Sequence, residues 1–153
     1  MTNNTVLQKI QYALHLEIAD ILRIYKQVGV VLDPKLAISY FMDVKNENFV
    51  SCPNDMLCAF LEGLIIERRG ANEKSPNPPV ISDEPLTNNA IFKKLRVALN
   101  FHDEDIRIAL ERVKVDTKKL DLSALFRKMG HKHYKPCTDS ILESFLMGIR
   151  IAK

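Results

Sequence analysis

Residues 52–64 read CPNDMLCAFLEGL, and residues 137–149 read CTDSILESFLMGI. The two stretches share a first cysteine, a leucine, a Phe-Leu pair and a glycine, and each shared residue lies 85 positions from its copy. The same spacing relates Thr2-Asn3-Asn4 to Thr87-Asn88-Asn89 near the start of each copy, where threonine and asparagine can supply the side-chain oxygens that cap a helix. A spacing that holds from one end of a unit to the other indicates an internal duplication.

The apolar pattern within each copy is typical of helices. Apolar residues of 52–64 and 137–149 recur at intervals of three and four, which places them on one helical face. Three further segments of this kind precede each stretch; the third begins at Asp33-Pro34 in the first copy and is expected over residues 119–128 in the second. The sequence therefore predicts an all-α fold, a tandem duplication of a four-helix unit, whose two halves pack with pseudo-twofold symmetry.

Several residues that match between the copies indicate structural roles. Gly63 and Gly148 lie inside the last helix of each copy, where glycine costs about 1 kcal/mol relative to alanine. We infer that helices cross closely at both positions. Cys52 and Cys137 precede the same two helices. A helix N-terminus can lower a thiol pKa, but a cysteine in a helical repeat is more often a small buried apolar group, and we adopt that interpretation.

A proline-rich segment joins the copies. Residues 75–79 read SPNPP, and Pro85 follows. Proline fixes φ and lacks the N–H that a helix interior needs. We therefore divide the chain into a first repeat over residues 1–69, a linker over residues 70–86 and a second repeat over residues 87–153.

Composition restricts the class of protein. Apolar residues make up 46% of the chain, which is enough for a packed core. No run approaches about 18 consecutive apolar residues, so no membrane span is expected. Residues 1–5 lack the basic and apolar regions of a secretory signal. Three cysteines suit reduced thiols better than a disulfide framework. These features predict a cytoplasmic protein.

Positive charge is concentrated in the second repeat. Residues 87–153 carry 14 basic and 8 acidic side chains, whereas residues 1–70 carry 7 and 8. The excess is densest at residues 127–135, here called the basic loop, which contains no acid. Its candidate binding residues are Arg127, Lys128, His131, Lys132, His133, Tyr134 and Lys135. Cations beside an aromatic ring suit phosphate oxygens and a stacked base. They equally suit an acidic protein surface, and a solvated loop that only aids solubility is a third alternative.

A metal-binding or enzymatic alternative rests on His131, His133 and Cys137. Imidazole and thiolate are good zinc ligands, and a Cys–His pair can activate a thiol. In an extended loop, however, the rings of His-x-His point in alternating directions, and the sequence offers no second ligand cluster. It also lacks a glycine-rich phosphate loop and the common hydrolase motifs. We therefore predict no metal and no cofactor, and we name no catalytic residue.

The second and third helices of each repeat follow the order of the helix-turn-helix pair of phage-repressor-like domains, whose second helix enters the major groove. Gly29 and Ile38 are nine residues apart, which is longer than the tight turn of that motif. The second repeat is better placed to grip a nucleic-acid backbone. Its cations around the third helix are Lys118, Lys119, Arg127 and Lys128. A helix-turn-helix-like DNA-binding role is therefore one hypothesis.

Three stretches of the chain resemble the signature of the YehS-like bacterial family, which is catalogued as domain of unknown function 1456. They are residues 60–70 (FLEGLIIERRG), 122–128 (LSALFRK) and 130–137 (GHKHYKPC). The Thr-Asn-Asn start of each repeat is similar as well. The resemblance implies a duplicated helical fold in a cytoplasmic bacterial protein, and it implies no activity.

The two copies act as internal controls for each other. Residues that match between them are assigned to structure, and the basic loop, which does not match, is assigned to function. The predicted function is a non-catalytic binding or regulatory module that uses the basic face of the second repeat against nucleic acid or an acidic partner. The alternative is an enzyme or metal-binding protein that uses His131, His133 and Cys137.

Overall fold

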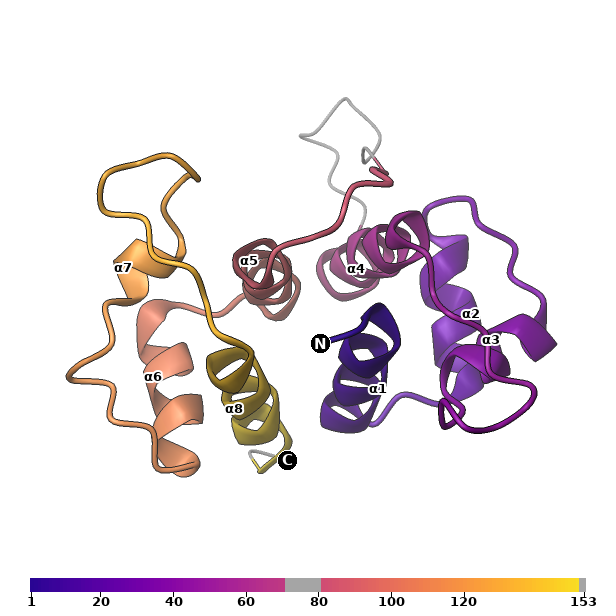
Figure 1. Ribbon diagram of the computed structural model, residues 1–153, viewed down its shortest axis with the longest axis horizontal. Helices are drawn as coiled ribbons and strands as arrows, with labels where there is room; N and C mark the ends of the chain where they lie inside the picture. The colour runs from indigo at the N-terminus through magenta and orange to yellow at the C-terminus, as the bar shows by residue number, and fades with distance from the viewer. Residues whose placement is uncertain (71–80, 152–153) are drawn as a thin grey trace. The chain divides into compact units, whose positions relative to one another are not determined.

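The computed structural model describes residues 1–70 and 81–151, and every element of regular secondary structure in them is a helix (Figure 1). The chain divides into two compact units, residues 1–86 and residues 87–153. The expected linker, residues 70–86, lies mostly outside the described residues. The predictions of an all-α fold and of a tandem duplication are confirmed.

Within the described residues, four helices form the first unit and four form the second. The helices of the first unit are α1 (Asn3–Leu14), α2 (Ile18–Lys26), α3 (Pro34–Tyr40) and α4 (Asn54–Arg69). The helices of the second unit are α5 (Asn88–Leu99), α6 (Asp103–Arg112), α7 (Leu122–Leu125) and α8 (Asp139–Ile151). Helices α1, α2 and α4 each begin 85 residues before α5, α6 and α8, so the sequence repeat is also a repeat of structure.

Matched residues begin and end the first helix of each unit. Thr2 and Thr87 each accept, at 3.1 Å, a hydrogen bond from the backbone N–H three residues further on. This bond satisfies one of the amides that the first turn of a helix leaves unpaired. His15 and Asn100 end α1 and α5 in the left-handed conformation, both with a φ of 56°. The threonine caps expected from the sequence are therefore present in both copies.

The last helix of each unit packs against the second helix at a glycine. A Cβ added to Gly63 of α4 would overlap the backbone carbonyl oxygen of Ile24 in α2. A Cβ added to Gly148 of α8 would overlap the carbonyl oxygen of Ala109 in α6. Backbones approach this closely only where no side chain intervenes. The close helix crossings inferred from the two glycines are confirmed.

Each unit has an apolar core with its own aromatic pair. Tyr25 and Phe60 meet edge to face in the first unit, with ring centroids 5.8 Å apart. Phe92 and Phe145 stack in the second unit at 4.5 Å. Full burial of such a side chain contributes roughly 1.5–3 kcal/mol, so these pairs hold α4 and α8 in their units. The Tyr25 hydroxyl donates to the Met56 carbonyl at 2.9 Å, which satisfies its polar atom.

The third helix of the second unit is shorter than expected. A helix was predicted over residues 119–128, but α7 spans only Leu122–Leu125. The Asp121 carboxylate accepts the Ala124 N–H and so fixes the start of the helix. At the other end, the Phe126 N–H bonds the carbonyl only three residues back, and the chain then leaves the helix. The prediction was wrong because the apolar spacing continues past the point where the backbone turns away.

Candidate functional site

A buried asparagine in α5 holds the two ends of the basic loop together. The Asn89 amide group donates to the carbonyl of Leu125, just before the loop, at 2.9 Å and to the carbonyl of Lys135, at its end, at 2.8 Å. Its side-chain oxygen accepts the N–H of Cys137 at 2.8 Å. Because all three partners are backbone atoms, the loop can change its side chains and keep this attachment.

The first unit contains the same attachment at equivalent positions. Asn4 donates to the carbonyls of Tyr40 and Val50 at 3.1 and 2.9 Å, and it accepts the N–H of Cys52 at 2.9 Å. Each partner lies 85 residues before its equivalent in the second unit. Residues 42–50, here called the counterpart loop, therefore occupy the place in the first unit that the basic loop occupies in the second. The Thr-Asn-Asn motif predicts helix capping, but nothing in the sequence alone indicates this second role of Asn4.

The basic loop is a series of turns that exposes its cations. The His131 N–H bonds the Lys128 carbonyl at 3.0 Å, and the Tyr134 N–H bonds the His131 carbonyl at 2.9 Å. Gly130 has a φ of +93°, a conformation that favours glycine. Tyr134 is half-buried, and the other candidate binding residues of the loop are exposed.

The net charge of the basic loop is five units more positive than that of the counterpart loop. The basic loop has four cations and no acid, a net charge of +4, whereas the counterpart loop has one cation and two acids, a net charge of −1. Among the described residues, no carboxylate forms an ion pair with Arg127, Lys128, Lys132 or Lys135. Asp121 lies close enough for Lys135 to contribute to lowering its pKa, although the Ser123 hydroxyl is the largest cause. The cations of the loop are thus available to an external anion.

A pocket of about 230 Å³ lies between the start of α5 and the first half of the basic loop. Lys93 of α5 lines it together with Arg127 and Lys128, and no acidic residue does. Met129 and Tyr134 are also part of its lining. The structure therefore adds to the basic loop a cation of α5, Lys93, which was not among the candidate binding residues. The signal that could have found it is the comparison of the copies, since Gln8 stands at the equivalent position.

The histidines of the basic loop lie beside each other, contrary to expectation. The His131 and His133 ring centroids are 5.5 Å apart, and His131 Nδ1 accepts the His133 N–H at 3.0 Å. The prediction of rings in alternating directions was wrong because the segment turns instead of extending. Cys137 differs from both histidines in being buried. In the part of the chain that the structure describes, no three His, Cys, Asp or Glu side chains gather where they could hold a metal ion.

The two matched cysteines do not have the properties of activated thiols. Burial raises the pKa of Cys52 to about 12 and that of Cys137 to about 11. The nearby carboxylates of Asp55 and Asp139 act in the same direction. The thiolate is the reactive form, so both side chains are inert near neutral pH.

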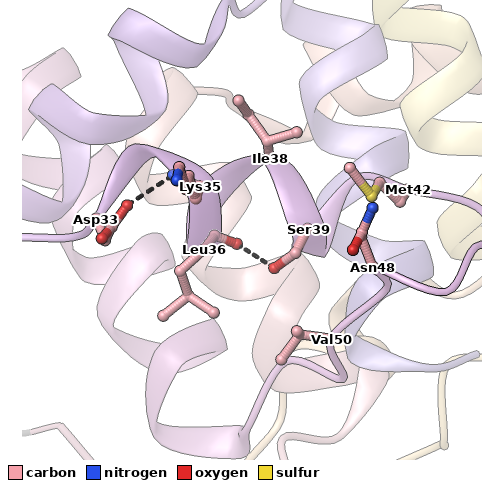
Figure 2. Close-up of a pocket in the computed structure, with 8 residues that line it drawn as sticks. All are labelled: Asp33, Lys35, Leu36, Ile38, Ser39, Met42, Asn48 and Val50. Carbon is pink, nitrogen blue, oxygen red and sulfur yellow. Dashed lines mark hydrogen bonds between the residues drawn. The ribbon is translucent and has the colours of Figure 1, made fainter.

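An apolar groove of about 720 Å³ lies along α3 in the first unit (Figure 2). Asp33 and Lys35 stand at one end in the view, and Met42 and Asn48 stand at the other. Its apolar lining consists of Leu36, Ile38, Met42 and Val50. The equivalent residues of the second unit are all polar or charged: Asp121, Ser123, Arg127 and Lys135. The two units thus present different chemistry on the same face, and sequence analysis did not identify this groove.

The structure places the cations of the second unit outside its third helix. Lys118 and Lys119 precede α7, and Arg127 and Lys128 follow it. A recognition helix reads bases from side chains along its own length, and α7 has only four residues. These four cations therefore lie on loops, where they can contact a phosphate backbone.

The sequence profile of a protein family of unknown function, DUF1456, matches residues 3–70 and 88–153. The chain belongs to this family. It is also similar to the uncharacterized protein YehS of Escherichia coli (strain K12), with 30% identity over 149 residues that cover 97% of this chain and 94% of that protein. No solved structure matches the chain. Each matched segment lies within one structural unit. Among the described helices, none has both the length and the apolar character that crossing a bilayer requires.

Proposed function

We propose that this protein is a non-catalytic binding or regulatory module whose basic loop binds a polyanion, and that single-stranded nucleic acid fits the loop best. The observation that carries the proposal is the contrast between the two loops. Both are attached by the same three hydrogen bonds of a buried asparagine, yet their net charges are +4 and −1. Since the fold accepts either charge, the cations serve something other than folding.

The energetics favour a polymer of phosphates as the partner. Unpaired cations close together repel one another, and a polyanion relieves that repulsion while it releases its own condensed counterions. Tyr134 and Met129, which is 65% exposed, lie among the cations and offer surfaces on which bases can pack. These side chains favour single strands, whose bases are free to stack. An acidic protein surface also pairs with these charges, but it has no unstacked bases for Tyr134 and Met129 to contact.

No observation favours the enzymatic alternative. His131 Nδ1 is occupied by a backbone N–H, and the Cys137 thiol is buried with a raised pKa. A Cys–His pair needs an ionisable, accessible thiol beside its base. The same residues are explained by the turn that shapes the loop and by packing at the start of α8.

Fluorescence anisotropy of labelled polymers tests the proposal. A single-stranded oligonucleotide, a duplex of the same sequence and poly-glutamate are titrated with the protein over a range of salt concentrations. We expect the single strand to bind tightest, with an affinity that falls steeply as salt is added. Tighter binding of poly-glutamate would favour an acidic protein partner, and failure of all three polymers to bind would contradict the proposal.

Matched variants localise the binding. The double variant Arg127→Met with Lys128→Asp gives the basic loop the residues of the counterpart loop, Met42 and Asp43. Its control, Lys35→Met with Lys45→Asp, removes the same charge from the first unit. The first variant should lose most of the affinity for the single strand, and the control should keep it. Equal losses would mean that net charge, and not the basic loop, determines binding.

A further inference from the structure

We infer that the pocket lined by Lys93, Arg127 and Lys128 is a subsite for one phosphate group. The inference rests on the proposed function, because the phosphate that it takes there is one of the bound strand. It goes beyond that proposal by assigning a fixed position to a phosphate and by adding a residue of α5 to the interface.

The three cations reach the pocket from two separate elements. Lys93 lies on α5, whereas Arg127 and Lys128 follow α7. The loop that carries the latter two is tied to α5 through Asn89, so the cations are held around one space. No acidic residue lines this space to neutralise them. An arrangement of this kind favours an anion with several oxygens, as a phosphate has.

The first unit shows that none of the three cations is needed for folding. The residues equivalent to Lys93, Arg127 and Lys128 are Gln8, Met42 and Asp43. Gln8 makes neutral hydrogen bonds at the equivalent position, since its amide donates to the carbonyls of Tyr40 and Met42 at 3.3 and 3.2 Å. The second unit has a cation in place of each of these three residues, including the acidic Asp43.

The volume of the pocket and the side chains that line it suit the phosphate of a nucleotide. Its volume, about 230 Å³, is below the range of roughly 300–1,000 Å³ that is typical of sites for drug-sized ligands. It is therefore suited to a phosphate group and part of its sugar. Tyr134 and Met129 line the same pocket and can contact the adjoining sugar or base. Arg96 is engaged elsewhere, because its guanidinium pairs with Asp103 at 2.8 Å and covers the Phe126 ring.

The test uses the variant Lys93→Gln, which introduces the residue of the first unit and leaves the basic loop unchanged. Its matched control is Lys114→Gln, which removes the same charge from an exposed position of the second unit that does not line the pocket. Binding of a single-stranded oligonucleotide is measured over a range of salt concentrations. We expect Lys93→Gln to weaken binding several-fold and to reduce the slope of log affinity against log salt by about 0.7, the loss of one phosphate contact.

A second probe separates a phosphate of the strand from a free phosphoryl ligand. Inorganic phosphate is added to the isotopically labelled protein, with sodium chloride of equal ionic strength as the reference. Amide NMR signals of Ala90 and Lys128 should shift in the wild type and in Lys114→Gln, and they should stay in place in Lys93→Gln. Inorganic phosphate that shifts these signals in a protein that binds no oligonucleotide would support the subsite and overturn the proposed function.

Two further outcomes of these experiments would each show that the phosphate subsite is wrong. If the oligonucleotide binds and Lys93→Gln behaves like Lys114→Gln with both probes, the proposed function stands and the phosphate subsite is wrong. If neither the oligonucleotide nor inorganic phosphate binds to the wild type, both inferences are wrong.

Discussion

At the scale of single residues, one buried asparagine in each repeat makes three hydrogen bonds to backbone that is distant in sequence. Asn4 and Asn89 each connect the first helix of a unit to the end of the third helix, to the loop and to the start of the fourth. The repeat of Thr-Asn-Asn in the sequence indicated that the motif matters, and its threonine was correctly identified as a cap. The partners of the asparagine could not be predicted, because they depend on how the chain folds over α1 and α5.

The variant Asn89→Ala tests this role. It leaves two carbonyls and one N–H of the backbone without their partner, and each buried unsatisfied group costs about 1–3 kcal/mol. Because water can reach part of this backbone, we expect a total loss of about 2–4 kcal/mol in the free energy of unfolding, measured by urea denaturation. Asn88→Ala is the control, since Asn88 also bonds a backbone carbonyl but is only half-buried. A loss no larger than that of the control would contradict the assigned role.

The two buried thiols give the stability of the protein a pH dependence. In the unfolded chain a cysteine ionises near pH 8.5, whereas in the folded protein the pKa is about 11 for Cys137 and about 12 for Cys52. The folded state therefore excludes the thiolate. The contribution of the thiols is fully present below about pH 8.5 and is lost as the pH rises toward about 11 for Cys137 and about 12 for Cys52. We expect the free energy of unfolding to fall over this interval, and to fall less in the variant Cys52→Ala with Cys137→Ala. An identical decline in both proteins would show that other groups are responsible.

At the scale of helices, the sequence predicted most where a feature occurs in both repeats. Local chemistry that can be read from the sequence predicts the threonine caps, the start of α3 at Asp33-Pro34 and the crossings at Gly63 and Gly148. Prediction failed where long-range contacts determine the local structure, as they do for the length of α7. The groove of α3 was missed for a different reason, because its apolar residues satisfy a helical pattern whether they face the core or the solvent.

The glycine crossings give a prediction at this scale. Gly63→Ala and Gly148→Ala each place a methyl group against a backbone carbonyl, which cannot rotate away as a side chain could. The helices must separate, and we expect each variant to lose about 3 kcal/mol or more in the free energy of unfolding. Gly130→Ala is a useful comparison, because open space surrounds that position and only its φ of +93° opposes a side chain, a penalty of about 1–2 kcal/mol. Losses at Gly63 and Gly148 no greater than at Gly130 would contradict the close crossings.

At the scale of the whole molecule, the duplication separates what the fold needs from what it does not. Caps, crossings and asparagine attachments recur in both units, whereas charge does not. The second repeat carries 14 basic and 8 acidic side chains, and the first 70 residues carry 7 and 8. Sequence comparison of the copies was sufficient to select the basic loop. The structure was needed to show that the two loops are true equivalents and that Lys93 belongs with the basic one.

Exchange of the loop is the most direct test of the central claim that the basic loop binds single-stranded nucleic acid. Residues 127–135 are replaced by the nine residues of the counterpart loop, MDVKNENFV, which the backbone bonds of Asn89 can still hold. Circular dichroism and urea unfolding verify that the exchanged chain folds. The affinity for a labelled single-stranded oligonucleotide is then measured against salt concentration. We predict that the exchange removes most of the affinity and lowers the salt slope by about 2–3, the value expected for four lost phosphate contacts. An exchanged chain that binds with the affinity and salt slope of the wild type would contradict the claim.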